Sequence, residues 1–295
     1  MKHRHLALSR RHVISGLAAL PVTAACQSKE FRAPNFAALE TEFGGRLGVA
    51  ALDLASGRAL AHRADQRFAF CSSFKWLLGA FMLARMEAGE EDLERPITIK
   101  ESDLVFYSPV TEPLVGSSLS IGELCEATIT TSDNTAANLL ISELGGPDGF
   151  TSLLRQYGDT VTRLDRYETE LNENAPGDVR DTSSPNAMLG LMRTFLFEDA
   201  LMPGSRDILR RWMIDAKTGL QRLRAGLPDG WVAGDKTGTS VNDQSNDVAF
   251  AFPVDSPLRG PVIIVSFANV PDPLEPETNS IHGQVARITM GAFGI

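Results

Sequence analysis

Ser72 and Lys75 form the first pair in this 295-residue sequence whose types and spacing could support catalysis. They open the helix-like segment 72–89, and residues three positions apart share one face of a helix. A serine hydroxyl needs a base before it acts as a nucleophile, and a buried lysine can be that base because burial lowers its pKa. Free N–H groups at a helix N-terminus also stabilise an oxyanion. A serine cap followed by a helical lysine explains the same spacing, so this pair alone does not establish a site.

Two further short motifs follow in the sequence. Residues 132–134 read Ser-Asp-Asn at the start of another helix-like segment, where capping is a sufficient explanation. Lys-Thr-Gly occurs twice, at 217–219 and at 236–238. The first copy follows a helical pattern, and we interpret it as a structural helix end, because Thr-Gly stops a helix and lysine suits the negative end of its dipole. The second copy follows an apolar strand, whose edge glycine would let a substrate backbone lie close.

Metal and histidine chemistry have little support in the sequence. Only His62 and His282 lie beyond the first 12 residues, which is too few for a histidine-rich metal site. Neither has a ligand-like neighbour at helical spacing. We therefore expect no metal and no cofactor, and chemistry carried by other side chains.

The elements that must position these motifs lie in three blocks. Strand-like patterns occupy 46–63 near the start and 230–270 near the end, and helical patterns fill most of 72–215. A short helix precedes the first strands, and a final helix covers 281–293. The sequence predicts an α/β fold with an antiparallel sheet built from both chain ends, flanked by helices, and with an inserted all-helical subdomain.

Segment 163–182 is polar, acidic and interrupted by Pro176-Gly177. It lies inside the helical block and has no periodic pattern of its own. A loop of this length inside a compact domain is more often functional than idle, so we expect it to contribute to a site.

The first 25 residues have the pattern of a secretory signal peptide. A basic start is followed by a short apolar run and by Ala24-Ala25, which are typical of a cleavage site. Segment 9–14, Ser-Arg-Arg-His-Val-Ile, favours a twin-arginine signal over an ordinary signal with two adjacent arginines. We therefore predict an exported or periplasmic protein. Loss of the four basic residues of this leader would take the formal net charge from −9 to −13.

This acidic balance argues against nucleic acid as a partner, because no basic patch is available for the phosphates. Cys26 directly follows the leader and is similar to the lipid-attachment cysteine of bacterial lipoproteins, but Thr23 stands where leucine is usual. A lipid anchor at Cys26 and simple cleavage beside it remain alternatives. Residues 26–34 are interpreted as a tether, and 35–295 as a single catalytic domain. We expect the protein to be a monomer. Its α/β part would comprise about 35–64 and 216–295, and its helical part about 65–215.

Together the three motifs, in this order, resemble those of the class A serine β-lactamases over essentially all of residues 35–295. Tyr107-Ser108-Pro109 precedes Ser-Asp-Asn as it does in that family. Segment 166–172, Arg-Tyr-Glu-Thr-Glu-Leu-Asn, resembles the family's Glu-x-x-Leu-Asn loop, and segment 176–182 resembles the exit of that loop. The resemblance implies hydrolysis of β-lactam antibiotics, with the second Lys-Thr-Gly at the family's position.

The resemblance also implies catalytic roles. Ser72 would attack the lactam carbonyl, Lys75 would polarise or deprotonate its hydroxyl, and Ser132 would relay a proton to the departing nitrogen. Glu168 and Asn172 would position the water that hydrolyses the acyl-enzyme. Whether Lys75 or Glu168 is the base during acylation is left open. The N–H groups of Ser72 and Thr239 would form the oxyanion hole.

Further residues would hold the substrate. The resemblance implies a wall for the substrate, a partner for its side-chain amide and a cluster facing its carboxylate. Arg222 is added because its segment leads into the strand from below the site, although a solvated surface arginine is the alternative. Arg166 and Asp181 would pair at the neck of the loop. The implied substrate-binding residues are Tyr107, Asn134, Asn172, Arg222, Lys236, Thr237 and Thr239.

Two departures from the family pattern matter. Thr169 stands where many relatives have proline, which puts the geometry of the loop after Glu168 in doubt. Some relatives have a disulfide between the positions of Cys125 and Gly79, and others have one between the positions of Cys71 and Ser240. In this sequence neither position 79 nor position 240 is a cysteine. We therefore predict no disulfide, and infer no carbapenem-hydrolysing activity.

Three rival functions fit parts of the pattern. A D-alanyl-D-alanine carboxypeptidase or transpeptidase shares the three motifs but lacks the Glu-x-x-Leu-Asn loop. A penicillin-sensing module would acylate at Ser72 and stop there. An esterase with a serine-histidine-acid triad would need His62 or His282, and neither lies in a catalytic motif.

Overall fold

The computed structural model describes residues 35–240, 242–255, 260–271 and 276–295. The predicted leader and tether, with Cys26, lie outside these residues. None of the helices in the described ranges is long and apolar enough to cross a membrane.

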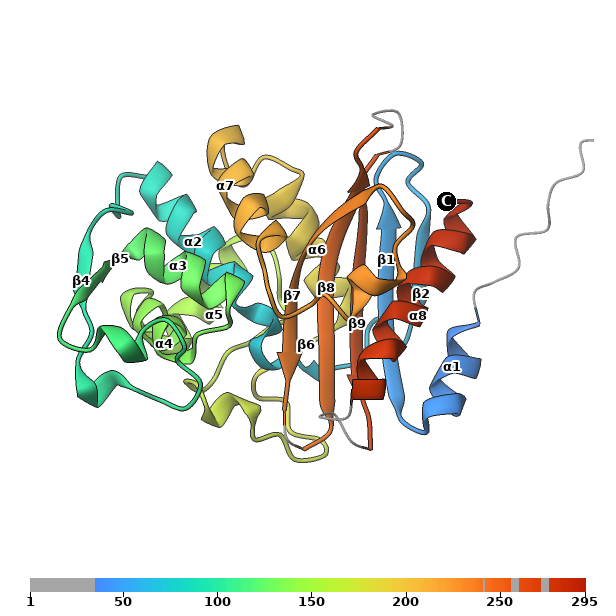
Figure 1. The fold of residues 1–295 in the computed structure, drawn as a ribbon, viewed down its shortest axis with the longest axis horizontal. Helices are drawn as coiled ribbons and strands as arrows, with labels where there is room; N and C mark the ends of the chain where they lie inside the picture. The colour runs from blue at the N-terminus through green and yellow to red at the C-terminus, as the bar shows by residue number, and fades with distance from the viewer. Residues whose placement is uncertain (1–34, 241, 256–259, 272–275) are drawn as a thin grey trace, which may run out of the picture. The chain divides into compact units, whose positions relative to one another are not determined.

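Five strands form one antiparallel sheet in the order β2-β1-β9-β8-β7 (Figure 1). Strand β1 pairs with β9 over eight residues, from Arg46 opposite Asn269 to Asp53 opposite Val262, so the two ends of the domain meet in the middle of the sheet. This confirms the predicted sheet built from both chain ends. The strands are β1 Arg46–Asp53, β2 Ala59–His62, β7 Trp231–Thr239, β8 Gln244–Pro253 and β9 Val262–Asn269.

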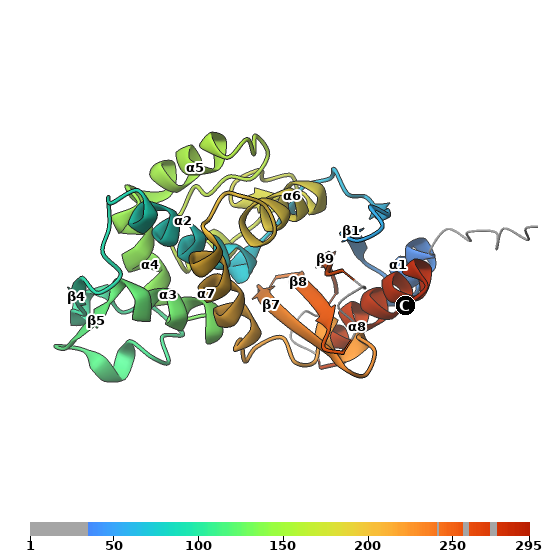
Figure 2. The same ribbon diagram turned by 90° about the horizontal axis from the view of Figure 1, so that it is seen from above.

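The two faces of the sheet border different cores, because successive side chains of a strand point to opposite sides. On β9, Val262 and Ile264 pack in a core with helices α1, Phe36–Phe43, and α8, Pro276–Phe293. Ile263 and Val265 point the other way, into the large core shared with the helical part. Figure 2 shows α1 and α8 on one side of the sheet and the other helices on the opposite side.

Helix α2 runs through the centre of the helical part and is buried nearly all round, as its apolar sequence predicts. The sequence analysis did not separate α3 and α5 from their neighbours. The helices of this part are α2 Trp76–Glu87, α3 Ile121–Thr130, α4 Asn134–Glu143, α5 Gly146–Gln156, α6 Pro185–Leu196 and α7 Pro203–Ile214. The hairpin of β4, Pro96–Thr98, and β5, Ser118–Ser120, lies beside them.

A second two-stranded ladder joins the two chain segments that carry the nucleophile and the long loop. Strand β3, Phe68–Ala69, pairs with β6, Thr182–Ser183. Directly after it, the N–H of Phe70 donates to the carbonyl of Asp181 at 3.2 Å. The end of the loop is therefore hydrogen-bonded to the residues just before Ser72.

Candidate active site

Ser72 lies in a 3₁₀ turn, Cys71–Phe74, that leads into α2, and not at the first turn of the α-helix as the sequence predicted. The preceding Cys71 has a φ of +48°, a left-handed conformation that is uncommon for a residue with a side chain. Such backbone positions cluster at functional sites. The turn directs Ser72 into a cavity of about 730 Å³.

Lys75 is fully buried beside Ser72, three residues further along the chain. Its Nζ lies 3.0 Å from Oε1 of Glu168 and donates to the carbonyl of Ser132 at 2.9 Å and to Oδ1 of Asn134. Burial lowers the pKa of Lys75, and the carboxylate of Glu168 opposes that shift. The charge of this ammonium group therefore depends on its acidic neighbour.

The carboxylate of Glu168 is buried between three functional groups. Its Oε1 accepts a hydrogen bond from Oγ of Ser72 at 3.2 Å, and its Oε2 accepts one from Nδ2 of Asn172 at 2.7 Å. In the described part of the chain, Ser72 Oγ makes no hydrogen bond to Lys75. The Oδ1 of Asn172 is buried and has no hydrogen-bond partner there, so it is an acceptor available to a water or a ligand beside Glu168.

The loop that carries Glu168 is fixed at its neck. Nε of Arg166 donates to Oδ2 of Asp181 at 2.6 Å, and Oδ1 of Asp181 accepts from the N–H groups of Asp165 and Arg166. Asp181 is buried, and burial raises its pKa although these bonds lower it. The bond between Glu168 and Thr169 is cis, the position where the departure from proline put the loop in doubt.

Asn138 holds the backbone of Glu168, and the sequence analysis missed it. Its Nδ2 donates to the carbonyl of Glu168 at 2.8 Å, and its Oδ1 accepts from the N–H of Glu168 at 2.8 Å. A signal existed, because Asn138 follows Asn134 by four residues and so lies on the same face of α4. That face points toward the loop.

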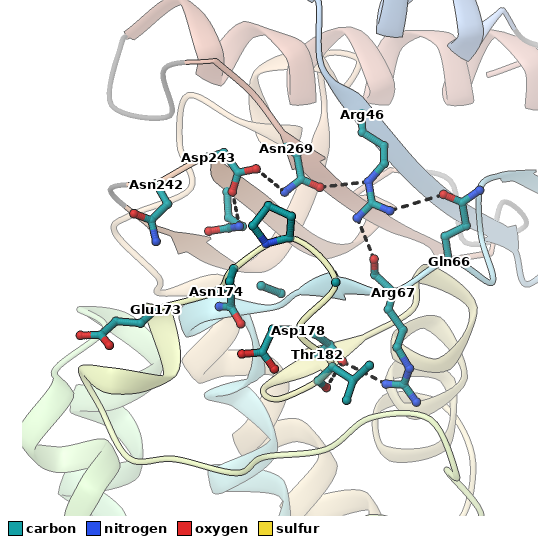
Figure 3. Close-up of a pocket in the computed structure, with 16 residues that line it drawn as sticks. Arg46, Gln66, Arg67, Glu173, Asn174, Asp178, Thr182, Asn242, Asp243 and Asn269 are labelled. Atoms are coloured by element: carbon teal, nitrogen blue, oxygen red, sulfur yellow. Dashed lines mark hydrogen bonds between the residues drawn. The ribbon is translucent and has the colours of Figure 1, made fainter.

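Behind the loop lies a second cavity, of about 1260 Å³ (Figure 3). Its polar side chains mostly satisfy one another: the guanidinium of Arg46 donates to Asn269 and to the carbonyl of Arg67, and Asn269 donates to Asp243. The stretch from Glu173 to Thr182 therefore covers a cavity instead of a packed core. The position of Glu168 depends on the neck and on Asn138.

Ser132 connects the two lysines of the site. It has a φ of +64°, and its Oγ accepts from Nζ of Lys236 at 3.1 Å and from Nζ of Lys75 at 3.5 Å. Lys236 is fully buried, and burial, reinforced by the positive charge of Lys75, lowers its pKa to about 7. A hydroxyl between two lysines is suited to pass a proton.

Strand β7 presents the hydroxyls of Thr237 and Thr239 to the same cavity, and Arg222, which precedes β7 in the chain, also lines it. Nη2 of Arg222 donates to Oγ1 of Thr239 at 2.7 Å, and Nη1 donates to the carbonyls of Gly238 and Asn246. Arg222 is 7% exposed, so the surface alternative is wrong. Nε donates to Asn279, and among the described residues one of the five N–H donors, on Nη2, has no partner and is available to a ligand.

Gly238 allows β7 to lie against the nucleophile turn. A Cβ at this position would lie 2.4 Å from the carbonyl oxygen of Phe70 and 2.8 Å from the N of Ser73. Only a residue without a side chain fits so close to another backbone. This contact brings Thr239 next to Ser72.

The first Lys-Thr-Gly copy is not a helix end, because α7 ends at Ile214. Oγ1 of Thr218 lies 2.8 Å from Oγ1 of Thr237, and Thr218 lines the cavity. A Cβ on Gly219 would lie 1.6 Å from Oδ2 of Asp235. The first copy therefore packs beside the second, and each glycine is required by a close contact.

Two carboxyls lie beneath β7. Asp247 pairs with Thr237 across the β7–β8 ladder, and Asp235 lies two residues before Thr237 on the same face. Burial raises the pKa of both carboxyls, and the charge of Asp235 raises that of Asp247 further. Within the described residues, Oδ2 of Asp235 and Oδ1 of Asp247 are buried without a hydrogen-bond partner. Arg224 donates to Asp235, and the N–H of Leu223 donates to Asp247 at 2.9 Å. This pair fixes the segment that carries Arg222.

The rim of the cavity opposite β7 is formed by Phe106, Tyr107 and Asn134. Tyr107 is 50% exposed and Phe106 is 83% exposed, and the sequence analysis did not single out Phe106. Asn134 is fixed from both ends of its amide: Nδ2 donates to the carbonyl of Phe106 at 2.7 Å, and Oδ1 accepts from Lys75. The available signal was an aromatic residue directly before the Tyr107-Ser108-Pro109 motif.

The histidines and cysteines lie outside this arrangement. His282 is buried between Oγ of Ser245 and Oγ of Ser266, and His62 contacts Glu40. Cys71 and Cys125 are both buried and free. Within the described ranges, no group of three or more histidine, cysteine or acidic side chains could hold a metal ion.

Comparison with known proteins places this arrangement in a family. A family model described as "Beta-lactamase enzyme family" matches residues 32–293. "Beta-lactamase AST-1" of Nocardia asteroides is 42% identical over 280 residues, which cover 95% of this chain and 89% of that protein. "Beta-lactamase FAR-1" of Nocardia farcinica is 42% identical over 259 residues, covering 88% and 82%.

Solved structures agree with the sequence relatives. An ancestral class A β-lactamase superposes with a TM-score of 0.84 at 50% identity, covering 88% of this chain and 99% of that one. A β-lactamase from Xanthomonas campestris pv. campestris superposes with a TM-score of 0.84 at 43% identity, covering 88% and 96%. The chain therefore belongs to the β-lactamase enzyme family, and within it to the class A serine enzymes.

Proposed function

We propose that this class A β-lactamase hydrolyses the amide of penicillins and cephalosporins through an acyl-enzyme on Ser72, which a water held by Glu168 then deacylates. Hydrolysis of these antibiotics confers resistance to them. The observation that carries the proposal is the convergence on one carboxylate: Glu168 Oε1 lies 3.2 Å from Ser72 Oγ and 3.0 Å from Lys75 Nζ.

In the acylation step, Oγ of Ser72 attacks the lactam carbonyl while its proton passes to a base. The direct hydrogen bond from Ser72 favours Glu168 as that base, with Lys75 stabilising the carboxylate. The N–H groups of Ser72 and Thr239 would hold the developing oxyanion, and the close approach at Gly238 supports this pairing. As the amide C–N bond breaks, Ser132 would give its proton to the nitrogen and regain one from Lys75. Lys75 would then take from Glu168 the proton that left Ser72, which leaves Glu168 a carboxylate for the next step.

In the deacylation step, Glu168 would take a proton from a water as that water attacks the ester carbonyl, and the proton would return to Ser72 as the C–O bond breaks. The hydrogen bond from Asn172 to Glu168 and the free Oδ1 of Asn172 support a water site between them. Arg166 and Asp181 would act through the loop, by keeping Glu168 in place.

Substrate binding would depend on charge at one end of the cavity and on shape at the other. The substrate carboxylate would face Lys236, Thr237 and Thr239, with the remaining N–H of Arg222 directed to the same anion. Asn134 would hold the side-chain amide, and Tyr107 would be the wall. Because every group in these roles comes from one chain, we propose that the enzyme acts as a monomer, without cofactor or metal.

We also propose that the protein is exported, by the twin-arginine route, to the periplasm. The support is the sequence pattern of residues 1–25. Attachment of a lipid at Cys26 is the alternative to simple cleavage beside it. The mass of the mature protein would distinguish the two.

The test of the proposed function is turnover. We expect the purified protein to hydrolyse many equivalents of a chromogenic cephalosporin, measured by absorbance, with Ser72 labelled transiently in the mass spectrum. Stoichiometric labelling without turnover would instead support a penicillin sensor. Hydrolysis of D-alanyl-D-alanine peptides in preference to the cephalosporin would support a carboxypeptidase.

The pH dependence of kcat/KM should reflect the ionisation of Lys236. Its pKa is lowered to about 7 in the free protein, and only its protonated form supplies a positive charge to the substrate carboxylate. Because kcat/KM follows ionisation in the free enzyme, kcat/KM should fall as the pH rises through about 7. In Lys236→Arg the guanidinium stays charged, so the alkaline fall should move to higher pH. The same fall in the arginine variant would assign it to another group, such as Lys75.

A further inference from the structure

The segment that contains the first Lys-Thr-Gly copy is fixed against both halves of the site. The N–H of Lys217 donates to the carbonyl of Thr130 at 2.9 Å, and the N–H of Arg222 donates to the carbonyl of Gly219 at 3.0 Å. Gly219 packs directly on the buried carboxyl of Asp235. The segment between these anchors therefore has a set position relative to β7.

From this position, Thr218 contacts the second Lys-Thr-Gly copy. Its Oγ1 accepts a hydrogen bond from Oγ1 of Thr237 at 2.8 Å, and both threonines line the cavity that also contains Ser72 and Arg222. Thr218 is only partly buried, whereas the neighbouring Lys217 side chain is exposed. Within the described residues, this is the one hydrogen bond of the Thr218 hydroxyl and of the Thr237 hydroxyl.

A hydroxyl can donate one hydrogen bond while it accepts another. To bind a carboxylate, Thr237 must donate its hydrogen to the anion and cannot at the same time donate to Thr218. With an anion bound, the hydrogen bond of this structure can reverse by rotation of both hydroxyls: Thr218 then donates to Thr237, and Thr237 donates to the anion. Each bond in such a chain polarises the next and strengthens it.

We propose that Thr218 is a positioning residue for the substrate carboxylate: when the anion binds, the Thr218 hydroxyl changes from accepting to donating toward Thr237 and so directs the hydrogen of Thr237 at the anion. This inference rests on the proposed function, since it assigns Thr237 to the carboxylate of a β-lactam. It gives the first Lys-Thr-Gly copy a role in recognition as well as in packing.

The test compares Thr218→Val, which removes the hydroxyl at nearly constant volume, with Thr218→Ser, which keeps it. The bond to the carboxylate is present in both the bound substrate and the transition state, so its loss should raise KM and leave kcat unchanged. We expect kcat/KM for a chromogenic cephalosporin to fall roughly three- to tenfold in Thr218→Val, the effect of one hydrogen bond. Thr218→Ser should restore most of it, and Lys217→Ala, which changes an exposed neighbour, should match the unmutated protein.

A double-mutant cycle with Thr237→Val separates this role from packing. If Thr218 acts through Thr237, then Thr218→Val should cause no further loss in the Thr237→Val background. An equal loss in both backgrounds, a failure of Thr218→Ser to rescue, or a change in kcat alone would overturn the inference. Mass spectrometry of the acylated Ser72 separates a failure of this inference from a failure of the proposed function. If the unmutated protein never acylates, both are overturned. If it acylates and the losses from the two substitutions are additive, only this inference is overturned.

Discussion

Replacement of Glu168 by alanine is expected to convert the enzyme into one that acylates and then stops. The variant loses the carboxylate that would activate the deacylating water, and general-base catalysis contributes about 10²–10⁴-fold to such steps. We expect kcat for a chromogenic cephalosporin to fall by about 10³-fold, and the acyl-enzyme on Ser72 to persist long enough to be seen by mass spectrometry.

Acylation should survive in this variant because the environment of Lys75 also changes. The carboxylate of Glu168 is the largest influence that raises the pKa of Lys75 against the effect of burial. Without that carboxylate, the pKa of Lys75 should fall further, and the neutral amine can then act as the base. Acylation should be slower than in the unmutated protein but faster than deacylation.

Two control variants sharpen the result. Ser72→Ala should show neither turnover nor covalent labelling. Glu170→Ala, an exposed glutamate two residues further in the same loop, should hydrolyse the cephalosporin like the unmutated protein. A Glu168→Ala enzyme that keeps full turnover would remove Glu168 from the mechanism, and one that never acylates would make Glu168 the only base for both steps.

The sequence predicted those parts of the site that depend on local pattern. Apolar periodicity and capping residues placed Ser72 and Lys75 near the start of α2 and Ser132 before α4, and the strand pattern placed Lys236 on β7. Short motifs in a fixed order then indicated that these segments converge. Apolar runs in the terminal strands predicted the sheet, because burial on both faces restricts these strands to mostly apolar residues.

Contacts between segments distant in the sequence could not be predicted in this way. Asn138 holds Glu168, which lies 30 residues away in the sequence, and its position on the same helix face as Asn134 does not indicate which loop that face contacts. The first Lys-Thr-Gly copy was assigned to a helix end because its local signals fit one. Its Thr218 and Gly219 instead contact Thr237 and Asp235, and these contacts depend on how segment 216–222 packs against β7.

Replacement of Gly238 by alanine is expected to have the second large effect. The added Cβ would lie 2.4 Å from the carbonyl oxygen of Phe70 and 2.8 Å from the N of Ser73, where both neighbours are backbone and cannot rotate away. Strand β7 and the nucleophile turn must therefore separate by several tenths of an ångström or more. Displacements of about 1 Å at a reacting centre can cost 10²-fold in rate, so we expect kcat/KM to fall by about 10- to 100-fold.

The same substitution should also destabilise the fold, because overpacking costs about 1–3 kcal/mol. Gly190→Ala is the matched control: Gly190 lies in α6 with no atom within 4 Å of an added Cβ, and alanine in a helix interior is more stable than glycine by about 0.5–1 kcal/mol. The control should therefore keep full kcat/KM with an equal or higher melting temperature. If Gly238→Ala matched it in both measurements, the oxyanion hole would not depend on the contact between β7 and the nucleophile turn. A loss in kcat/KM with little change in melting temperature would place the effect in the geometry of Ser72 and Thr239 and not in the stability of the domain.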